Sequence, residues 1–319
     1  MASEFALIAR HFTRPTSHTE LGVGDDGAIL ELAAGMRLVV STDMLVAGTH
    51  FLADTDPEAL GWKTLAVNLS DLAAMGATPR WAVVAVALPD ADERWLTSFC
   101  TGLFACAAAF DVDLVGGDTT RGPLNLCPTV FGQVPAAQAL LRSGAHPGDD
   151  IWISGSPGLA GLGLAHLQGR CKLSEPALTD CLAALQRPQP RVALGAALRG
   201  IASAAIDVSD GLLGDLGHLL ERSAVGAVLQ LELMPEAASR ACADPDLARR
   251  CLLGGGDDYE LLFTAAPSRR EQIRSIAARL TLPLTAIGEI VEGDGGLRLL
   301  RAGQELPAAA YRSYDHFAP

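Results

Sequence analysis

Four apolar runs in this chain end on aspartate, and this pattern constrains its fold more than any other feature. The runs are residues 38–43, 114–118, 205–210 and 252–258. The first three are predicted to be short buried strands that stop at a carboxylate, and open α/β sheets place ligand sites at strand ends. Several carboxylates in one place repel each other and resist desolvation unless a cation lies between them. The pattern therefore predicts an oxygen-rich site for Mg²⁺ or Ca²⁺, and the commonest reason for clustered Mg²⁺ is a nucleotide polyphosphate.

Length and composition predict two folded domains. The chain has 319 residues, of which 49% are hydrophobic and 19% charged, so it holds ample core material and leaves little scope for disorder. Helix and strand patterns occur in both halves, which predicts an α/β (α+β) fold for each. A turn cluster at 147–150 marks the connecting segment. The predicted domains are residues 1–138 and 139–319.

Charge and cysteine usage exclude several classes of protein. The net charge of −13 disfavours nucleic acid and anionic membranes as partners. Only two lysines occur, Lys63 and Lys172, so a phosphate site would use arginine, backbone N–H groups or metal. Seven cysteines without a Cys-x-x-Cys pair indicate reduced thiols and a cytoplasmic protein, and argue against zinc. No secretory signal and no membrane span are expected.

Residues 22–27 match the pattern G-x-G-x-x-G, with Asp43 near the place of a ribose-binding acid. The context argues against a dinucleotide site, because residues 15–20 form no strand and a strand rather than a helix follows. We favour a metal-binding loop in which Asp25 or Asp26 presents oxygen to a cation. A plain acidic turn remains the alternative.

A strong helix signal begins after Asp56, a good N-cap, with Pro57 in the first turn and Gly76 as the predicted end. Asp71 lies within two turns of the C-terminus, where the helix dipole disfavours negative charge. It shares a partly apolar face with Asn68, so its carboxylate needs a partner. An ion pair with arginine is possible, but we favour metal because other carboxylates can complete the shell.

Two further motifs join the predicted strands. Residues 116–120, Gly-Gly-Asp-Thr-Thr, follow a predicted strand at 113–115 and suit close approach to phosphate, although a hairpin turn explains them equally well. Residues 207–211 lie where a strand passes into a helix. Capping explains Ser209 and Asp210 but not Asp207 at the end of an apolar strand. Two carboxylates beside a helix N-terminus could hold metal-bound phosphate.

Other common catalytic patterns are missing from the sequence. It has no P-loop, no H-E-x-x-H, no G-x-S-x-G and no kinase catalytic loop. Among the seven histidines, His50 is the best candidate for a substrate contact because it follows Asp43 in a short loop. A structural role for His50 stays open.

Taken together, six motifs closely resemble those of the thiamine-monophosphate kinase family, within the superfamily of aminoimidazole ribonucleotide synthetase. The motifs are residues 24–28, 41–43, 48–51, 66–76, 116–120 and 207–211. Single motifs are shared across the superfamily. The full set in this order, with the ending Tyr314-Asp315-His316-Phe317, is specific to the kinase family, and the match runs from about residue 4 to the C-terminus.

The resemblance implies an N-terminal mixed sheet with helices that pairs across a homodimer, and a C-terminal α/β sandwich. ATP would be held by the N-terminal domain near the dimer interface. The implied reaction transfers the γ-phosphoryl group of ATP to thiamine monophosphate, giving thiamine diphosphate and ADP, with Mg²⁺ as cofactor.

The resemblance also assigns roles to residues. The implied metal ligands are Asp26, Ser41 or Thr42, Asp43, Asp71, Asp118, Asp207 and Asp210. The implied nucleotide contacts are Phe104, Gly117, Asp118, Arg142 and Ser209. The implied substrate contacts are His50, Asp257 and Phe317, and the implied catalytic residues are Asp71, Asp210 and Arg142.

Two positions depart from the family pattern. Asp257 replaces the usual glutamate, so a substrate contact there would be water-mediated or taken by Asp258. Phe104 stands where tyrosine is more usual, which removes a hydroxyl contact.

The sequence leaves two alternatives to the kinase. One is another ATP-dependent member of the superfamily. A selenophosphate synthetase would need a reactive cysteine and lysine near the N-terminus, and a hydrogenase maturation factor would need a C-terminal cysteine. Neither feature is present, since the first lysine and cysteine are Lys63 and Cys100 and the chain ends at Pro319. The other alternative is a non-catalytic nucleotide- or Mg²⁺-binding protein.

Overall fold

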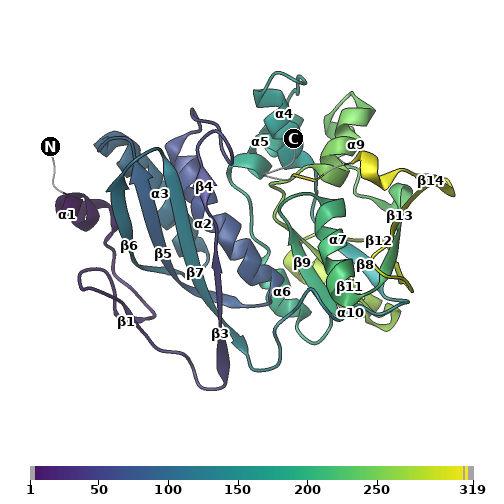
Figure 1. Ribbon diagram of the computed structural model, residues 1–319, viewed down its shortest axis with the longest axis horizontal. Coiled ribbons are helices and arrows are strands. Elements are labelled where there is room, and N and C mark those ends of the chain that lie inside the picture. The colour runs from purple at the N-terminus through teal and green to yellow at the C-terminus, as the bar shows by residue number, and fades with distance from the viewer. Residues whose placement is uncertain (1–3, 312, 315–319) are drawn as a thin grey trace. The chain divides into compact units, whose positions relative to one another are not determined.

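The computed structural model describes residues 4–311 and 313–314, and the chain divides into two compact units (Figure 1). The N-terminal unit comprises Met1–Leu72 and Ala77–Ala137, and the C-terminal unit comprises Ala73–Gly76 and Gln138–Pro319. Helices and mixed sheets occur in both units, which confirms the predicted two-domain α/β class.

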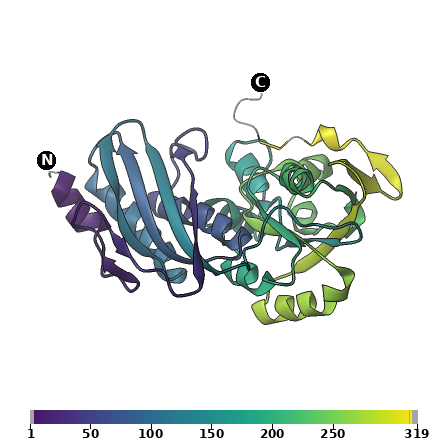
Figure 2. The same cartoon turned by 60° about the horizontal axis from the view of Figure 1, so that its bottom comes forward.

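The N-terminal unit is built around one mixed sheet with the strand order β3-β7-β5-β6, and β4 pairs with β7 (Figure 2). Only β5 and β6 run parallel, connected through α3. Its elements are α1 (Glu4–Leu7), the π-helix η1 (Ile8–Phe12), β1 (Thr19–Leu21), β2 (Ile29–Leu30), β3 (Met36–Thr42), β4 (Leu45–Val46), α2 (Pro57–Ala74), β5 (Thr78–Leu88), α3 (Glu93–Ala109), β6 (Asp113–Arg121) and β7 (Asn125–Pro135).

Local signals set the ends of α2 as expected, and a similar cap begins α3. The Asp56 carboxylate accepts the Ala59 N–H at 2.9 Å at the start of α2. Gly76 follows the helix in the left-handed region with φ +64°, a conformation that glycine adopts without strain. Asp92 caps α3 by accepting the N–H of Arg94 and Trp95.

Strand β6 differs from the prediction, because residues 116–120 lie inside the strand and not in a turn after it. The reason is the parallel neighbour β5, which pairs with β6 from Asp113 through Arg121. Gly117 has φ +151°, and a Cβ there would lie 2.0 Å from the Val84 carbonyl oxygen. Glycine is therefore required at Gly117 by contact with β5, whatever else binds there.

The two faces of the N-terminal sheet differ. One face packs on α2, since a side chain at Gly132 would meet Leu72. The other face presents apolar side chains that the described residues do not cover fully: Leu38 and Val40 are 46% and 51% exposed. We call this the open sheet face, formed by Leu38, Val40, Val83, Ala85 and Phe131.

The C-terminal unit is an α/β sandwich. Its seven-stranded sheet has the order β14-β13-β10-β12-β8-β11-β9. The strands are β8 (Asp150–Ser154), β9 (Ala204–Val208), β10 (Gly226–Gln230), β11 (Glu260–Ala265), β12 (Leu284–Val291), β13 (Leu297–Arg301) and β14 (Gln304–Leu306). The helices are α4 (Leu159–Leu167), α5 (Ala177–Gln186), α6 (Val192–Leu198), α7 (Leu212–Ser223), α8 (Ala237–Ala241), α9 (Pro245–Gly254) and α10 (Arg270–Leu280).

Alternate residues of the central strands supply two separate cores. On β9, Ile206 belongs to one apolar cluster and Ala205 to the other; on β11, Leu262 and Phe263 divide in the same way. A sheet covered on both faces explains why β8, β9 and β11 are buried at every position.

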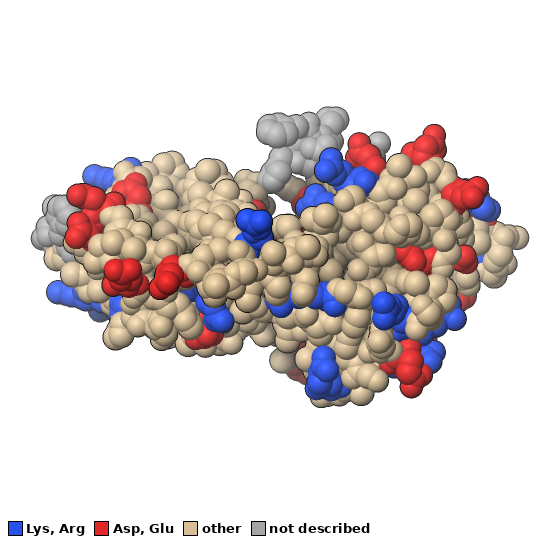
Figure 3. Space-filling view, turned by 90° about the horizontal axis from the view of Figure 1, so that it is seen from below, with Lys and Arg blue, Asp and Glu red and all other residues tan. Residues whose placement is uncertain are grey.

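The surface carries both signs of charge. Figure 3 shows Lys and Arg side chains interspersed with Asp and Glu over one face of the molecule. Among the described residues, no helix is both long enough and apolar enough to span a membrane.

Candidate functional site

In the N-terminal unit, β3 and α2 bring two of the predicted metal ligands together. The Ser41 hydroxyl donates to the Asp71 carboxylate at 2.5 Å, and the Asn68 amide lies 3.5 Å from the same oxygen. Asn68 is fully buried, and its Oδ1 accepts no hydrogen bond from any residue that the structure describes. The Asp71 carboxylate is therefore contacted by one hydroxyl and one amide N–H.

Strand alternation separates Ser41 from Thr42. The Thr42 hydroxyl lies on the other face of β3, where it donates to the Pro128 carbonyl and lies 2.9 Å from the Thr129 hydroxyl. Asp43 follows directly as the strand ends, and its N–H also donates to Pro128. Of the two hydroxyl side chains, only that of Ser41 faces Asp71.

The other predicted ligands of this unit lie in different places. Asp26 is exposed in the turn between β1 and β2, and Asp118 is exposed on the edge strand β6. No group of three or more His, Cys, Asp or Glu side chains within residues 4–311 and 313–314 is arranged to hold a metal ion. The expectation that these aspartates bind cations together stays a prediction.

The donor set nevertheless fits Mg²⁺ in its chemistry. All candidates are carboxylate or hydroxyl oxygens, which hard cations prefer. Mg²⁺ commonly takes one or two carboxylates and completes its shell with water and substrate phosphates, so it needs no preformed protein cage. The Ser41–Asp71 pair is suited to such partial ligation.

The surroundings of two further predicted contact residues, Phe104 and His50, are defined by the structure. The Phe104 ring on α3 is half-buried, and the Arg14 guanidinium lies over it with 4.5 Å to the centroid. His50 is half-buried after β4, and its Nδ1 accepts the Val46 N–H at 3.0 Å. In the neutral ring the proton is therefore on Nε2.

In the C-terminal unit, the 207–211 segment has its backbone groups satisfied by hydrogen bonds. One carboxylate oxygen of Asp215 accepts the N–H of Ser209, Asp210 and Gly211 at 3.0, 3.1 and 3.1 Å. The Ser209 carbonyl accepts from Asp257 at 2.8 Å, and the Asp210 carbonyl accepts from Tyr314 at 3.0 Å. The side chains of Ser209 and Asp210 take no part in these bonds.

This arrangement corrects the sequence interpretation of the segment. Ser209 and Asp210 do not cap a helix, because α7 begins at Leu212 with Gly211 as its N-cap. Their N–H groups are directed to Asp215 and cannot also hold a phosphate. Asp207 is buried within β9, and Asp210 is exposed.

Repulsion between carboxylates is evident at this segment. Burial raises the pKa of Asp215 to about 7, and the negative charge of Asp210 contributes to the increase, although the three N–H donors lower it. A cation bound at Asp210 would relieve that repulsion.

The segment that carries Asp257 is held against the 207–211 segment. Asp257 and Tyr259 both have positive φ, 66° and 50°. Their N–H groups donate to Ser209 and Val208, each at 2.8 Å. The Tyr259 hydroxyl donates to the Asp257 carboxylate at 3.1 Å. The predicted nucleotide contact Ser209 and the predicted substrate contact Asp257 are therefore directly hydrogen-bonded.

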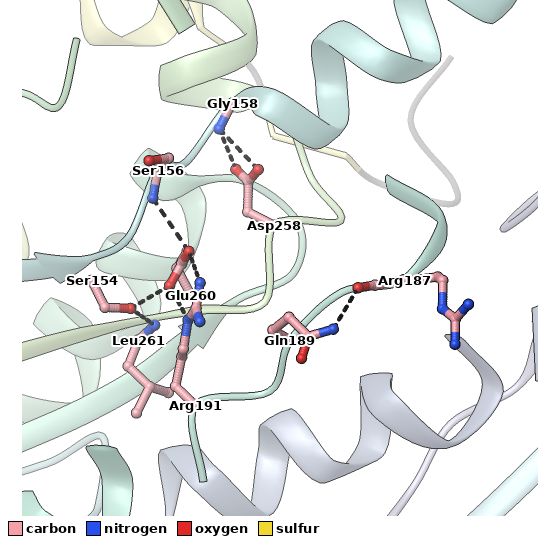
Figure 4. A network of polar contacts seen from close by, with 9 residues as sticks. All are labelled: Ser154, Ser156, Gly158, Arg187, Gln189, Arg191, Asp258, Glu260 and Leu261. Carbon is pink, nitrogen blue, oxygen red and sulfur yellow. Dashed lines mark hydrogen bonds and ion pairs between the residues drawn. The ribbon is translucent and has the colours of Figure 1, made fainter. Parts of the chain in front are cut away.

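Asp258, the other residue considered for a substrate contact, already has a backbone partner. Both oxygens of its carboxylate accept the Gly158 N–H, at 2.9 and 2.7 Å, at the N-terminus of α4 (Figure 4). Desolvation raises the pKa of Asp258 well above its ordinary range; the Gly158 N–H opposes this, and the charge of Glu260 adds to it.

Glu260 is buried at the start of β11 and holds several elements together. Its carboxylate accepts two hydrogen bonds from the Arg191 guanidinium, at 2.6 and 2.5 Å, and one from the Ser154 hydroxyl at 2.5 Å (Figure 4). The Ser156 N–H also donates to it at 3.3 Å. The network fixes the strand that follows Asp257 and Asp258.

Arg142 and Phe317 are the remaining predicted residues. Arg142 has an exposed side chain in the segment between β7 and β8. Phe317 lies outside the described residues. Ser313, close before it in the chain, accepts the Gly214 N–H at 2.9 Å, so the preceding segment contacts the start of α7.

Sequence reasoning missed Asp215, Arg191 and Glu260. The only signal for Asp215 is a carboxylate in the first turn of the helix that follows the Asp207–Gly211 motif, as in a capping box. Arg191 and Glu260 are 69 residues apart, and no local pattern links them.

Comparison with known protein families agrees with the two-domain division. Residues 24–134 match the family model "AIR synthase related protein, N-terminal domain", and residues 146–299 match "AIR synthase related protein, C-terminal domain". The fold and these matches define the class as AIR synthase related.

Individual relatives are more specific. The thiamine-monophosphate kinase of Escherichia coli (strain K12) is 47% identical over 99% of this chain and 98% of its own length. A crystal structure of thiamine-monophosphate kinase from Stenotrophomonas maltophilia K279a has a TM-score of 0.84 at 46% identity and covers 94% of this chain and 95% of its own. AaThiL complexed with AMPPCP and TMP has a TM-score of 0.78 at 29% identity and covers 92% of each chain. The chain belongs to the thiamine-monophosphate kinase family, which confirms the resemblance inferred from the motifs.

We predict that Arg191→Met destabilises the C-terminal unit by about 3–5 kcal/mol, because it leaves the buried Glu260 carboxylate unpaired. The double variant Arg191→Met with Glu260→Gln should recover much of that loss. Urea unfolding of the two variants and the wild type measures the effect. A loss below about 1 kcal/mol, the range of exposed ion pairs, would show that the pair is not structural.

Proposed function

We propose that the chain phosphorylates thiamine monophosphate with ATP, producing thiamine diphosphate and ADP. The observation that carries this function is the 47% identity to a thiamine-monophosphate kinase over 99% of the chain. The relative complexed with AMPPCP and TMP supports the same two substrates.

Mg²⁺ is the proposed cofactor, and the chain offers it oxygen ligands in each unit. In the N-terminal unit the proposed ligands are Asp26, Ser41 or Thr42, Asp43, Asp71 and Asp118. In the C-terminal unit they are Asp207 and Asp210. When bound, Mg²⁺ would neutralise phosphate charge and align the phosphates.

The proposed nucleotide contacts come from both units. In the N-terminal unit, they are Phe104, Gly117 and Asp118. In the C-terminal unit, Ser209 offers its hydroxyl and Arg142 its exposed guanidinium. Since the N–H groups of the 207–211 segment are already used by Asp215, the geometry favours recognition by side chains there.

The reaction requires no general base from the protein. The acceptor phosphate of thiamine monophosphate is already an anionic oxygen nucleophile. The chain's task is to orient both phosphates and to offset their repulsion, with Asp71, Asp210 and Arg142 as the proposed catalytic residues.

The proposed substrate contacts suit a cationic thiazolium ring. Asp257 is acidic and is oriented by Tyr259, and Phe317 would offer an aromatic face. His50 would donate from Nε2, because its Nδ1 is already an acceptor. The shorter side chain of Asp257, with Asp258 committed to Gly158, favours a water-mediated contact at this position.

A homodimer formed through the N-terminal unit is part of the proposal. The open sheet face exposes Leu38 and Val40 by about half, and a contiguous apolar surface of this kind suits a protein interface. We further propose a cytoplasmic location, which is supported because none of the seven cysteines, all within the described residues, forms a disulfide bond.

We predict that Asp71→Asn lowers kcat by about 100-fold or more, in the range typical of lost electrostatic or metal-site groups. The assay is ADP formation that depends on thiamine monophosphate, ATP and Mg²⁺. Asp56→Asn is the matched control on the same helix, because asparagine caps a helix as well as aspartate. Near-wild-type turnover of Asp71→Asn would contradict the metal assignment. A wild-type protein that binds ATP without forming thiamine diphosphate would contradict the function.

We predict that Val40→Asp converts the dimer to a monomer, because it places a charge on the open sheet face. Sedimentation velocity measures the change. Leu233→Asp is the control, since Leu233 is similarly exposed, at 44%, but lies in the C-terminal unit. A wild-type monomer, or a Val40→Asp dimer as stable as wild type, would contradict the proposed interface.

A further inference from the structure

Asp215 is a buried carboxylate to which no role has been assigned. It lies in the first turn of α7 and is only 3% exposed. A single oxygen, Oδ2, accepts three successive backbone N–H groups, from Ser209, Asp210 and Gly211. Successive N–H groups that converge on one oxygen form an anion-binding nest, and here the protein's own side chain occupies it.

Helix capping alone does not account for this residue. Ser209 and Asp210 precede the helix, whose N-cap is Gly211, so two of the three bonds act outside α7. A carboxylate in this position is also costly, because it is buried and lies near the charge of Asp210. The three bonds therefore shape the segment before the helix more than they stabilise the helix.

The position of Asp215 determines which ligands the segment can bind. With the N–H groups of Ser209 and Asp210 directed to Asp215, and their carbonyls bonded to Asp257 and Tyr314, neither residue can rotate its backbone without losing several bonds. Gly211 adds to this, since it has φ +127° and a Cβ there would lie 2.8 Å from the Gly254 backbone. The exposed Asp210 side chain is therefore held on a rigid support.

We propose that Asp215 is a positioning residue for phosphoryl transfer, which holds the backbone of Ser209 and Asp210 so that the Asp210 carboxylate meets a divalent cation bound with the nucleotide. The inference rests on the proposed function, which assigns Ser209 to the nucleotide and Asp210 to the metal. Mg²⁺ demands near-ideal octahedral geometry, so a small displacement of Asp210 would weaken binding.

Two substitutions of Asp215 distinguish the effect of its hydrogen-bond acceptor from the effect of its side-chain volume. Asp215→Asn keeps one oxygen that can accept the three N–H bonds, whereas Asp215→Leu keeps a similar volume without an acceptor. We expect Asp215→Leu to weaken binding of AMPPCP with Mg²⁺ by about tenfold or more, the range reported for residues that orient metal ligands. The free Mg²⁺ concentration for half-maximal turnover should increase by a similar factor. Asp215→Asn should stay within about threefold of wild type on both measures.

The matched control is Asp149→Leu. Asp149 is in the same unit, is 5% exposed, and also accepts a backbone N–H, from His146 at 3.0 Å, and a hydroxyl, from Ser203 at 2.6 Å. The control should lower thermal stability without changing the Mg²⁺ dependence of the folded protein. Equal shifts in Mg²⁺ dependence for both leucine variants would show general destabilisation and overturn the inference.

A third variant keeps the test decisive if Asp215→Leu does not fold. Asp215→Glu retains charge and acceptor but moves the oxygen by one methylene, so it should also weaken binding of AMPPCP with Mg²⁺ by about tenfold. Wild-type affinity in Asp215→Glu, measured by calorimetry, would overturn the inference. Calorimetry also separates the two proposals, because it reports on Asp215 even if the wild type forms no thiamine diphosphate.

Discussion

Backbone hydrogen bonding around Ser209 and Asp210 is the constraint on which the proposed site of the C-terminal unit depends. Every N–H and carbonyl of these two residues is bonded, to Asp215, Asp257 and Tyr314. Because these bonds act together, a change in any one of them would require the segment to rearrange. The same bonds join the residue proposed for the nucleotide, Ser209, to the residue proposed for the substrate, Asp257. The two proposed recognition roles would thus share one rigid support, which suits a reaction that depends on the alignment of two phosphates.

In the N-terminal unit, the alternation of side chains along one strand serves two proposed sites. The two faces of β3 separate Ser41, which donates to Asp71 on α2, from Val40 on the open sheet face. One strand therefore contributes to the proposed metal site on one side and to the proposed dimer interface on the other. A shift of β3 by one residue would exchange these faces, and the pairing of Val40 with Phe131 on β7 fixes the register.

Sequence patterns predicted those features that depend on local signals. The cap at Asp56, the left-handed Gly76 and the strand that ends before Asp43 all follow from neighbouring residues. Features that depend on distant partners were not predictable. Residues 116–120 are strand and not turn because β5 pairs with them. Asp257 and Asp258 are adjacent and chemically alike, yet only Asp258 accepts the Gly158 N–H. In the sequence, Asp215 resembles any acidic residue on a helix, because its three N–H donors are apparent only in the folded structure.

The central claim is that carboxylates of this chain bind the nucleotide through divalent cations. Calorimetric titration of the wild-type protein with AMPPCP, once with Mg²⁺ and once with EDTA, tests it most directly. The account predicts that affinity falls by about 100-fold or more without the metal, because the phosphates would then face an acidic protein of net charge −13. Equal affinity under the two conditions would contradict it, since the nucleotide would then be held by the chain alone.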